Sequence, residues 1–437
     1  MHLFPTGRAV AVGLAWTALA LVAVPVGGLG PALALAGAGA LATFVWDAAG
    51  LARLRGPTLR RELPDRVAVG RDAEVILTLA SRDDAHLRAD LFEELSRDLA
   101  SSDPVFRGLA VAPGATLRLA YAIHPTRRGA RPLGDLVLLL RSPLGLAQRR
   151  LTFPGETLRV VPDTSGLLRR EALDPRRLLA ALGVKQARPR GSGMEFEALR
   201  EYVPGDDVRH IDWRATARRG RTMTRVYRHE RDHPVLLAID TSRLMGASCG
   251  RATALDLAIE GALALAYTAL HHGDRVGLTL FDGDLRGFLA PRRTRRVFGR
   301  LIDAVSEVQP RLIEPDYTRL VRELAQRQRQ RALVVVLTDF AHAQATAVLA
   351  PLTMLAQRHR LLLVALRNPL LDEVAQGSDE VDELVRYRRL VAWDLLHERE
   401  LALAELRRRR VLTLDATPAE VTPPLLNRYL ALRFGGD

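Results

Sequence analysis

The sequence predicts a membrane helical hairpin, then an all-β sandwich, then a doubly wound α/β domain. The hairpin is predicted by a long uncharged apolar stretch near the N-terminus. The sandwich is predicted by short strands with turn residues between them, and the α/β domain by apolar strands that alternate with helices. At 437 residues, of which 48% are hydrophobic, the chain can bury several cores. The expected boundaries are 1–56 for the hairpin, 57–163 for the sandwich, 164–233 for an Arg- and Asp-rich module with its linker, and 234–437 for the α/β domain.

Residues 9–46 contain no charged residue and no histidine. One membrane crossing needs about 20 apolar residues. Prolines and glycines near the middle divide the stretch, which predicts two helices, about 9–26 and 29–46, joined by a tight turn. A cleaved signal peptide would explain only the first half. Arginines flank the stretch at positions 8, 53, 55, 60 and 61 and none lies in the turn, so we expect a membrane protein whose soluble domains face the cytoplasm.

The composition limits the classes of ligand and partner. The formal charge is +13, but nearly all basic residues are arginine, and Lys185 is the one lysine. Such a strong preference for arginine is typical of codon bias. Aromatic residues make up 5%, which argues against base-stacking surfaces and makes a nucleic-acid partner an unfavoured alternative. Lys185 follows Val184, so the chain has no G-x-x-x-x-G-K phosphate loop, and no nucleotide is expected. The single cysteine, Cys249, excludes an intrachain disulfide and a Cys-rich zinc site.

Two patterns of hydrophobicity define the soluble part. Strands with alternating or continuous apolar residues are expected at 73–80, 116–124, 135–142 and 157–162, with one or two helical turns within 91–99. Such short strands predict an immunoglobulin-like sandwich. Further along, strands are expected at 235–240, 275–281, 332–339, 360–366 and 411–416, and helices at 254–272, 295–308, 318–330, 347–359, 396–410 and 422–434. This alternation predicts a parallel sheet covered on both faces.

Two short motifs match catalytic patterns in unsuitable surroundings. Residues 229–233 read H-E-x-x-H, but that zinc chemistry requires a helix, and Pro234 follows at once between predicted strands. In extended chain the two histidines would lie roughly 13 Å apart. Residues 246–250 match the nucleophile elbow G-x-S-x-G, yet Ser248 comes eight residues after the strand ends. We interpret the first as a solvated turn and the second as a flexible loop, and expect no zinc.

Polar side chains follow the predicted parallel strands where ligands usually bind. Asp240 and Ser242 follow the first strand, Asp339 ends the third and Thr318 begins a helix. Carboxylate and hydroxyl oxygens suit a hard cation such as magnesium. If no ion is bound, Asp240 and Thr318 would instead cap helices, and both interpretations stay open.

This arrangement resembles the metal-ion-dependent adhesion site of the von Willebrand factor A-type fold. That site uses D-x-S-x-S, a threonine and an aspartate, which here correspond to Asp240, Ser242, Thr318 and Asp339. Leu244 stands where the second serine is expected. The resemblance implies a Rossmann-type domain with a degenerate magnesium site.

Residues 193–230 closely resemble the signature of the bacterial family called "domain of unknown function 58", which also has an N-terminal hairpin and an S-P-L-G-L segment, here at 142–146. The matching residues are Gly193, Glu195, Phe196, Leu199, Arg200, Glu201, Tyr202, Gly205, Asp206, Asp207, Arg209, Ile211, Asp212, Trp213, Ala217 and Arg218. The resemblance implies a membrane anchor, a β-rich middle and a von Willebrand A-like end. It also implies a MoxR-type AAA+ ATPase as partner, because members of this family are commonly encoded beside one.

The acids of this signature allow several interpretations. Asp206, Asp207 and Asp212 with His210 resemble a nuclease-like cluster, but interleaved arginines favour paired, ionised carboxylates. We expect an Arg–carboxylate network that docks the module on the sheet or forms a partner surface, with Trp213 as a packed anchor. The sequence thus predicts a non-enzymatic interaction or scaffold protein that works in assembly or maturation of other proteins. The alternatives are a metal-dependent hydrolase that uses these loop carboxylates, and binding of anionic lipid or nucleic acid by the Arg-rich surface.

Overall fold

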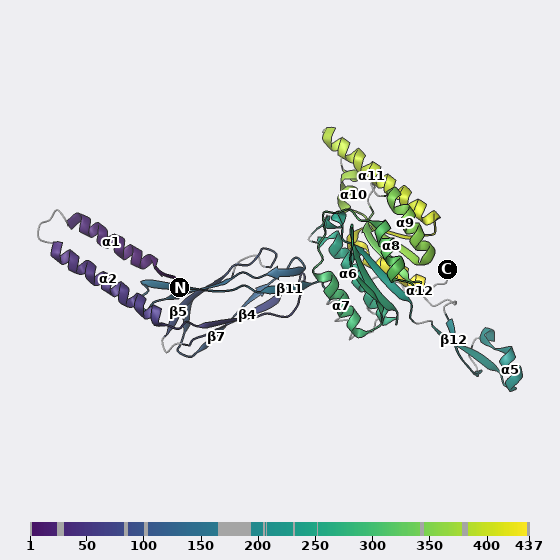
Figure 1. The fold of residues 1–437 in the computed structure, drawn as a ribbon, viewed down its shortest axis with the longest axis horizontal. Helices are drawn as coiled ribbons and strands as arrows, with labels where there is room; N and C mark the ends of the chain where they lie inside the picture. The colour runs from purple at the N-terminus through teal and green to yellow at the C-terminus, as the bar shows by residue number, and fades with distance from the viewer. Residues whose placement is uncertain are drawn as a thin grey trace. The chain divides into compact units, whose positions relative to one another are not determined.

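The computed structural model divides the chain into two compact units, Met1–Val161 and Pro162–Asp437 (Figure 1). The structure describes residues 2–23, 30–82, 86–99, 104–164, 194–203, 206, 208–229, 232–250, 252–340, 345–377 and 383–434. The first unit contains apolar helices and β-sheets, and the second contains a β-hairpin and a mixed α/β domain.

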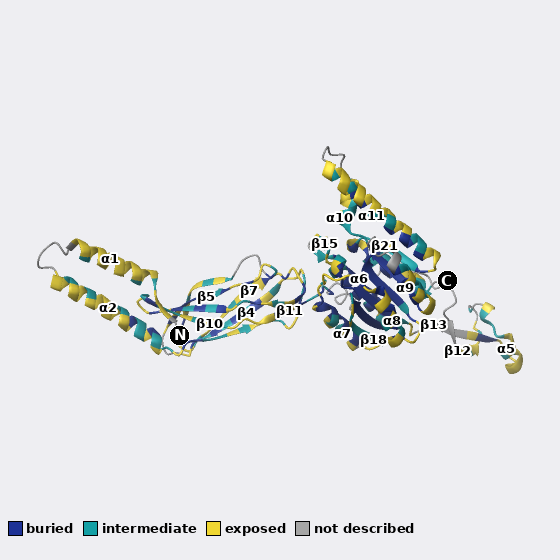
Figure 2. Cartoon of the chain, turned by 45° about the horizontal axis from the view of Figure 1, so that its top comes forward, coloured by how far each residue is buried: buried dark blue, intermediate teal, exposed yellow. Residues whose placement is uncertain are grey.

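Two apolar helices, α1 (Gly7–Ala23) and α2 (Gly30–Arg53), follow the short strand β1 (His2–Pro5). Most of their side chains are exposed, as the yellow ribbon of Figure 2 shows. Of the two, α2 has the length and composition of a membrane-crossing helix, and α1 is a shorter apolar helix. The prediction of two apolar helices is confirmed, whereas the connecting turn falls on residues 24–29, outside the described residues.

Asp47 joins α2 to the β-sheets of the same unit. Its side chain is 1% exposed and accepts hydrogen bonds from the Ser142 hydroxyl and from the backbone N–H groups of Leu144 at 3.0 Å and Leu146 at 3.1 Å. A buried carboxylate is stable only where such donors replace water. The S-P-L-G-L segment is therefore the turn that holds the end of α2.

The β-strands of the first unit form three sheets around one core. Their order is β1-β10-β9-β5-β6, β3-β11-β8 and β2-β4-β7. Val75, Leu91 and Val160, one from each sheet, are fully buried in the same cluster. The bounds are β2 (Thr58–Glu62), β3 (Val67–Ala68), β4 (Ala73–Ala80), β5 (Leu87–Glu93), β6 (Val105–Val111), β7 (Thr116–Ile123), β8 (Gly129–Pro132), β9 (Leu136–Arg141), β10 (Ala147–Phe153) and β11 (Thr157–Val161).

The prediction of helical turns within 91–99 is wrong for residues 91–93. Residues 91–93 belong to β5, which pairs with β6 on one side and β9 on the other. Two rows of ladder hydrogen bonds outweigh a weak local helical pattern. Strands such as β2 and β10 were not predicted, because adjacent arginines interrupt their apolar pattern.

The second unit begins with the antiparallel pair β12 (Met194–Glu201) and β13 (Met223–His229), which carries the signature residues. Between these strands lie the 3-10 helix η2 (Val208–His210) and the short helix α5 (Trp213–Arg219). The remainder is an α/β domain with a central sheet.

The six strands of that sheet lie in the order β18-β17-β14-β19-β20-β21, all parallel except the edge strand β18. Its central strands are the buried layer coloured dark blue in Figure 2. The strands are β14 (Pro234–Asp240), β17 (Arg275–Phe281), β18 (Leu285–Arg292), β19 (Leu333–Asp339), β20 (Arg360–Leu366) and β21 (Leu412–Ala416), with the two-residue strands β15 (Ser248–Cys249) and β16 (Ala252–Thr253) outside the sheet. The helices are α6 (Ala254–His271), α7 (Arg295–Ser306), α8 (Tyr317–Arg327), α9 (Ala345–Arg358), α10 (Pro369–Gln376), α11 (Glu383–Arg408) and α12 (Thr422–Phe434), with the 3-10 helices η3 (Arg243–Gly246) and η5 (Pro418–Glu420).

Most of these elements follow the predicted pattern of apolar strands and amphipathic helices. Three of the longer elements differ: β18 adds an antiparallel edge strand, α10 was not predicted, and α11 begins at Glu383 rather than near residue 396. The added part of α11 exposes Leu384, Tyr387 and Leu390, so it has no core-facing stripe that periodicity could reveal. Helix α6 is apolar enough to cross a membrane, but it is mostly buried as a core helix of the domain.

Asp274 links three elements at the start of the parallel strands. Its carboxylate is 1% exposed, accepts a hydrogen bond from Tyr429 Oη at 2.6 Å and pairs with the Arg433 guanidinium. The His233 backbone N–H donates to it at 3.3 Å. Burial acts to raise the pKa of Asp274, but the donors of His233, Tyr429 and Arg433 outweigh burial and hold this pKa below its usual range. Helix α12 is thereby fastened to the loops before β14 and β17.

We predict that Asp274→Ala lowers the stability of the α/β domain by about 3 kcal/mol, since it leaves the Arg433 charge buried without a partner. Tyr429→Phe should cost about 1 kcal/mol, because only one hydrogen bond is lost. Thermal unfolding followed by Trp393 fluorescence measures both. The exposed Asp284→Ala is the control, and an Asp274→Ala midpoint equal to that of this control would contradict the assignment.

Candidate functional site

The parallel pairing of β14 and β19 brings two acids to one edge of the sheet. Asp240 ends β14 and Asp339 ends β19, and the register pairs Ile239 with Leu337. Asp240 is 0% exposed and Asp339 is 6% exposed. Two carboxylates are therefore buried together at the carboxyl ends of neighbouring strands, as the sequence predicted for a ligand site in such a sheet.

Hydrogen bonds hold the Asp240 carboxylate in place. Thr338 Oγ1 donates to Asp240 Oδ2 at 2.6 Å, and Tyr317 Oη lies 2.7 Å from the same threonine oxygen. The backbone N–H of Ser242 donates to Oδ1 at 2.8 Å, closing a tight turn after the strand. Ser242 Oγ is buried and makes no well-aligned hydrogen bond with a described residue. An unsatisfied hydroxyl beside a buried carboxylate leaves oxygen atoms available to a ligand.

The pKa values of both acids are raised. Burial raises the pKa of Asp240 to about 6, although hydrogen bonds from Thr338 and Ser242 act in the opposite direction. Burial also raises the pKa of Asp339 to about 7, opposed by the Arg399 guanidinium and reinforced by the charge of Asp240. Since each ionised acid disfavours ionisation of the other, the pair binds protons or another cation more readily than an exposed carboxylate does.

Three residues of this site were missed by the sequence analysis. Asp282 is 1% exposed, directly follows β17, and lies 3.8 Å from guanidinium nitrogens of Arg286 and Arg311. Its signal was available, because it follows a predicted strand just as Asp240 does. Tyr317 and Thr338 gave no signal, because their role depends on the register between chain segments far apart in sequence.

The residues fit a hard cation in part. Asp240, Asp339 and the unsatisfied Ser242 hydroxyl offer oxygen ligands at one edge. Thr318, by contrast, is exposed in the first turn of α8, and its side chain makes no hydrogen bond within the described part of the chain. Leu244 is half-buried in η3 and offers no ligand atom. Among the described residues there is no group of three or more His, Cys, Asp or Glu with metal-binding geometry.

The signature module is held by ion pairs between its own residues. Arg200 donates to Asp206 Oδ1 at 2.6 Å, and Arg221 donates to Glu201 at 2.7 Å. The Asp206 carboxylate also accepts a hydrogen bond from the Val203 backbone N–H at 3.1 Å. Tyr202 Oη lies 3.5 Å from the backbone carbonyl oxygen of Asp206.

Asp212 organises the second half of the module as the N-cap of α5. Its Oδ1 accepts the backbone N–H groups of Arg214 and Ala215, both at 3.0 Å, and its Oδ2 accepts Arg225 Nε at 2.9 Å. The Ala215 N–H and the Arg225 guanidinium lower the pKa of Asp212. A carboxylate whose pKa is lowered by such donors is a structural acceptor and a poor proton donor.

The module exposes its larger apolar side chains. Trp213 is 70% exposed, Val208 63% and Val203 53%. The prediction that Trp213 is a packed anchor is therefore wrong: it occupies the first turn of a seven-residue helix with no buried residue. Arg209 and Arg218 lie in η2 and α5, while Gly205 and Asp207 lie outside the described residues.

The two catalytic-looking motifs fall on strands and connections. His229 ends β13, and His233 precedes β14, while residues 230 and 231 between them are not described. Ser248 and Cys249 form β15, a two-residue strand that pairs with β16. Where the structure describes them, neither segment has the helix or strand-to-helix elbow that its chemistry requires.

Residues 198–383 match the family described as "Protein of unknown function DUF58", which agrees with the resemblance in the signature. An uncharacterised protein of Mycobacterium bovis and uncharacterised proteins of two Mycobacterium tuberculosis strains are each 26% identical over 193 residues. Each match covers 44% of this chain and 60% of the relative's length.

Comparison with solved structures gives low overall similarity. The conserved hypothetical protein BatB of Bacteroides thetaiotaomicron covers 46% of this chain and 98% of its own, at 12% identity and a TM-score of 0.31. The CARDB domain of the Pyrococcus furiosus protein PF1109 covers 25% of this chain and 91% of its own, at 14% identity and a TM-score of 0.18.

We predict that Asp240 and Asp339 destabilise the α/β domain progressively as pH rises from about 4 to 7 in chelator-treated protein. Their pKa values are raised to about 6 and about 7, so at these two sites the folded state binds more protons than the unfolded state in this window. The lowered pKa of His272, about 4, acts in the opposite direction, so the measured quantity is the melting temperature of each variant relative to wild type. The relative melting temperatures of Asp240→Asn and Asp339→Asn should rise with pH. Asp394→Asn, an exposed carboxylate on α11, is the control, and relative melting temperatures that stay constant across the window would refute the buried acid pair.

Proposed function

We propose that the protein is a membrane-anchored, non-enzymatic interaction protein that works with a MoxR-type AAA+ ATPase in the assembly or maturation of other proteins. The observation that carries the proposal is the construction of the signature module. Its ion pairs Arg200–Asp206, Arg221–Glu201 and Arg225–Asp212 link residues of the module to one another. The side chains of Trp213, Val208 and Val203 are exposed. Exposed aromatic and aliphatic groups rimmed by arginines are typical of protein-binding surfaces.

We propose a second contact with the partner, through a magnesium ion bound by Asp240, Ser242 and Asp339. Thr318 comes within reach of the ion if α8 shifts on binding. These residues offer two carboxylates and one unsatisfied hydroxyl, fewer oxygen ligands than the ion accepts. A carboxylate of the partner completes the shell, as in the adhesion-type sites that this arrangement resembles. The von Willebrand A-like character of the domain is part of the same proposal.

The apolar helices α1 and α2 support the membrane anchor. Together with flanking arginines and an uncharged connecting segment, they favour a hairpin in the bacterial inner membrane with both soluble units in the cytoplasm. The alternative of a hydrolase draws on the raised pKa values of Asp240 and Asp339, because perturbed acids are common in active sites.

The single cysteine gives a test of orientation. We predict that Cys249 is not labelled by a membrane-impermeant maleimide in intact spheroplasts and is labelled after lysis. In a Cys249→Ser background, Gly28→Cys in the connecting segment should show labelling from outside. Labelling of Cys249 in intact spheroplasts would place the α/β domain on the opposite side of the membrane.

Partner capture tests the interaction surface. We predict that Trp213→Ala combined with Val208→Ser reduces co-purification of the MoxR-type ATPase from membranes at least fivefold, by removing about 1 kcal/mol or more of buried apolar contact. Asp240→Ala should reduce capture only in magnesium-containing buffer. Mass spectrometry of the tagged protein's eluate measures both effects.

Trp393→Ala is the matched control, because Trp393 is a similarly exposed tryptophan on α11. Equal capture by wild type and the Trp213/Val208 variant contradicts the interaction surface. Turnover of phosphoesters or peptides by the purified chain with magnesium, manganese or zinc, lost on Asp240→Ala, would favour the hydrolase instead.

A further inference from the structure

An open hollow lies at the amino ends of the parallel strands, the edge of the sheet opposite to Asp240 and Asp339. It has a volume of about 1450 Å³. Its walls come from the residues that begin β14, β19, β20 and β21 and from the last turns of α11 and α12. Parallel strands place all their first residues together, so the hollow is a direct consequence of the sheet topology.

Eight arginines line this hollow, against two acids, Asp232 and Asp274. Asp274 pairs with Arg433 and accepts a hydrogen bond from Tyr429. Arg408 and Arg409 pair with Glu405. Four arginines of the lining make no ion pair with any described acid, namely Arg331, Arg407, Arg410 and Arg428. We name these four the arginine cluster.

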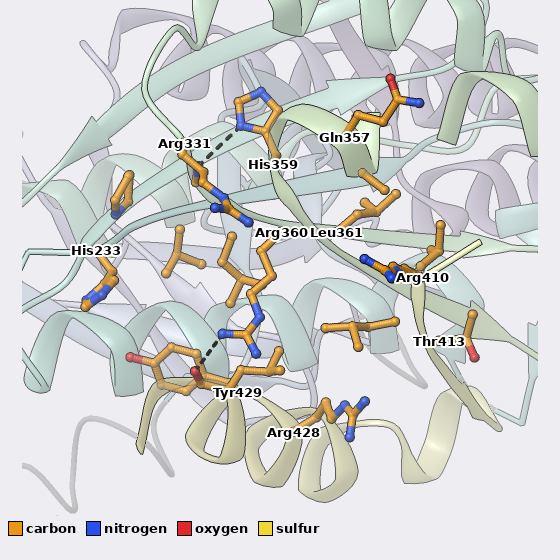
Figure 3. Close-up of a pocket in the computed structure, with 18 of the residues that line it drawn as sticks. His233, Arg331, Gln357, His359, Arg360, Leu361, Arg410, Thr413, Arg428 and Tyr429 are labelled. Carbon is orange, nitrogen blue, oxygen red and sulfur yellow. Dashed lines mark hydrogen bonds between the residues drawn. The ribbon is translucent and has the colours of Figure 1, made fainter. Parts of the chain in front are cut away.

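All four residues of the arginine cluster are exposed, and they line the hollow from three elements: the segment before β19, the end of α11 and α12. In Figure 3, the guanidinium groups of Arg331 and Arg410 extend from opposite sides toward the middle, with Arg360 and Leu361 between them and Arg428 on α12 below. Arg407 is fixed by the hydrogen bond from its Nε to Thr413 Oγ1 at 2.6 Å. Cations gathered around one cavity repel each other, so an anion inside it lowers the energy of the folded state.

Helix electrostatics explains part of this arrangement. Arg407 and Arg410 lie at the end of α11, where the helix dipole favours positive charge. The dipole does not account for Arg331, which precedes β19, or for Arg428, which lies in the middle of α12. Arg410 also adopts a left-handed backbone conformation, with φ of 62°, at a position where glycine is usual.

His359 belongs to the lining, but its ring is buried behind the surface of the hollow. It is 1% exposed, and its Nδ1 accepts the Ala332 backbone N–H at 3.3 Å, which places the ring proton on Nε2. Nε2 has no hydrogen-bond partner among the described residues.

We propose that this hollow binds a ligand with two or more phosphate groups through the arginine cluster. Guanidinium groups donate paired N–H groups that match phosphate oxygens, and they stay protonated at every physiological pH. The separate positions of Arg331, Arg410 and Arg428 suit several phosphate oxygens better than a single carboxylate. The volume exceeds that of pyrophosphate, so the rest of the ligand also lies in the hollow. A soluble pyrophosphate ester and phospholipid headgroups offer this same chemistry.

The test uses the full chain in nanodiscs of phosphatidylcholine, with inorganic pyrophosphate as the probe in isothermal titration calorimetry. The variant is Arg331→Gln combined with Arg410→Gly. Glycine accepts the left-handed conformation of position 410, and Arg331 is exposed, so the fold is kept. Arg300→Gln, an exposed arginine on α7 outside the hollow, is the control. Melting temperatures of all three proteins verify that each is folded.

We expect pyrophosphate to bind wild type and Arg300→Gln equally, and the double variant at least tenfold more weakly. Co-flotation of the nanodiscs with vesicles that contain cardiolipin, a lipid with two phosphates, dependent on the same two arginines, also supports the proposal and identifies lipid headgroups as the source of phosphate. The proposal is overturned if neither probe binds at millimolar concentration, or if the double variant binds as wild type does. Tighter binding of an octaglutamate peptide or an oligonucleotide than of pyrophosphate likewise overturns it.

Discussion

The parallel pairing of β14, β19, β20 and β21 is the constraint on which the rest of the α/β domain depends. Parallel strands must all begin at one edge and end at the other, so residues far apart in the sequence meet according to their place in the strand. Strand ends carry Asp240 and Asp339, and the segments before the strands carry arginines. One sheet therefore has an acidic edge and a basic edge. Neither site is created by a local motif: G-x-S-x-G contributes no lining residue to the hollow, and H-E-x-x-H contributes only Asp232 and His233, which lie there because they directly precede β14.

Sequence periodicity was sufficient for the elements that bury a regular stripe or run. β14, β17 and β20 were placed within one residue, because continuous apolar runs have few other solutions than a buried strand. The edge strand β18 and the first half of α11 were not predicted, because they bury no regular stripe or run. Their apolar residues face solvent or only a partial layer. In the first unit, residues 91–93 became strand through pairing on both sides, which is a long-range effect absent from any local window.

The candidate site was predictable to the extent that it depends on strand ends. Asp240 and Asp339 follow from that rule, and Asp282 would have followed had it been applied to every strand. Thr338 and Tyr317, which hold the Asp240 carboxylate, depend on register and helix placement, and Thr318 shows that a position at the start of a helix does not determine where its side chain lies. In the signature module, the sequence showed that charged residues of both signs are abundant. The Asp212–Arg225 pair could not be predicted, because it depends on the β12–β13 hairpin. The exposure of Trp213 could not be predicted either, because it depends on the short length of α5.

The two edges are screened from each other through solvent. β14 has seven residues, which at about 3.3 Å per residue separates its ends by roughly 20 Å. That distance is more than twice the Debye length of about 8 Å at physiological ionic strength. A cation held by the acids therefore changes the potential at the arginine cluster very little through solvent. The buried layer between them is apolar and closely packed, so its strands transmit a displacement only as rigid elements. Any coupling between ligands at the two edges would consequently report a shift of strands or helices and not direct attraction between opposite charges.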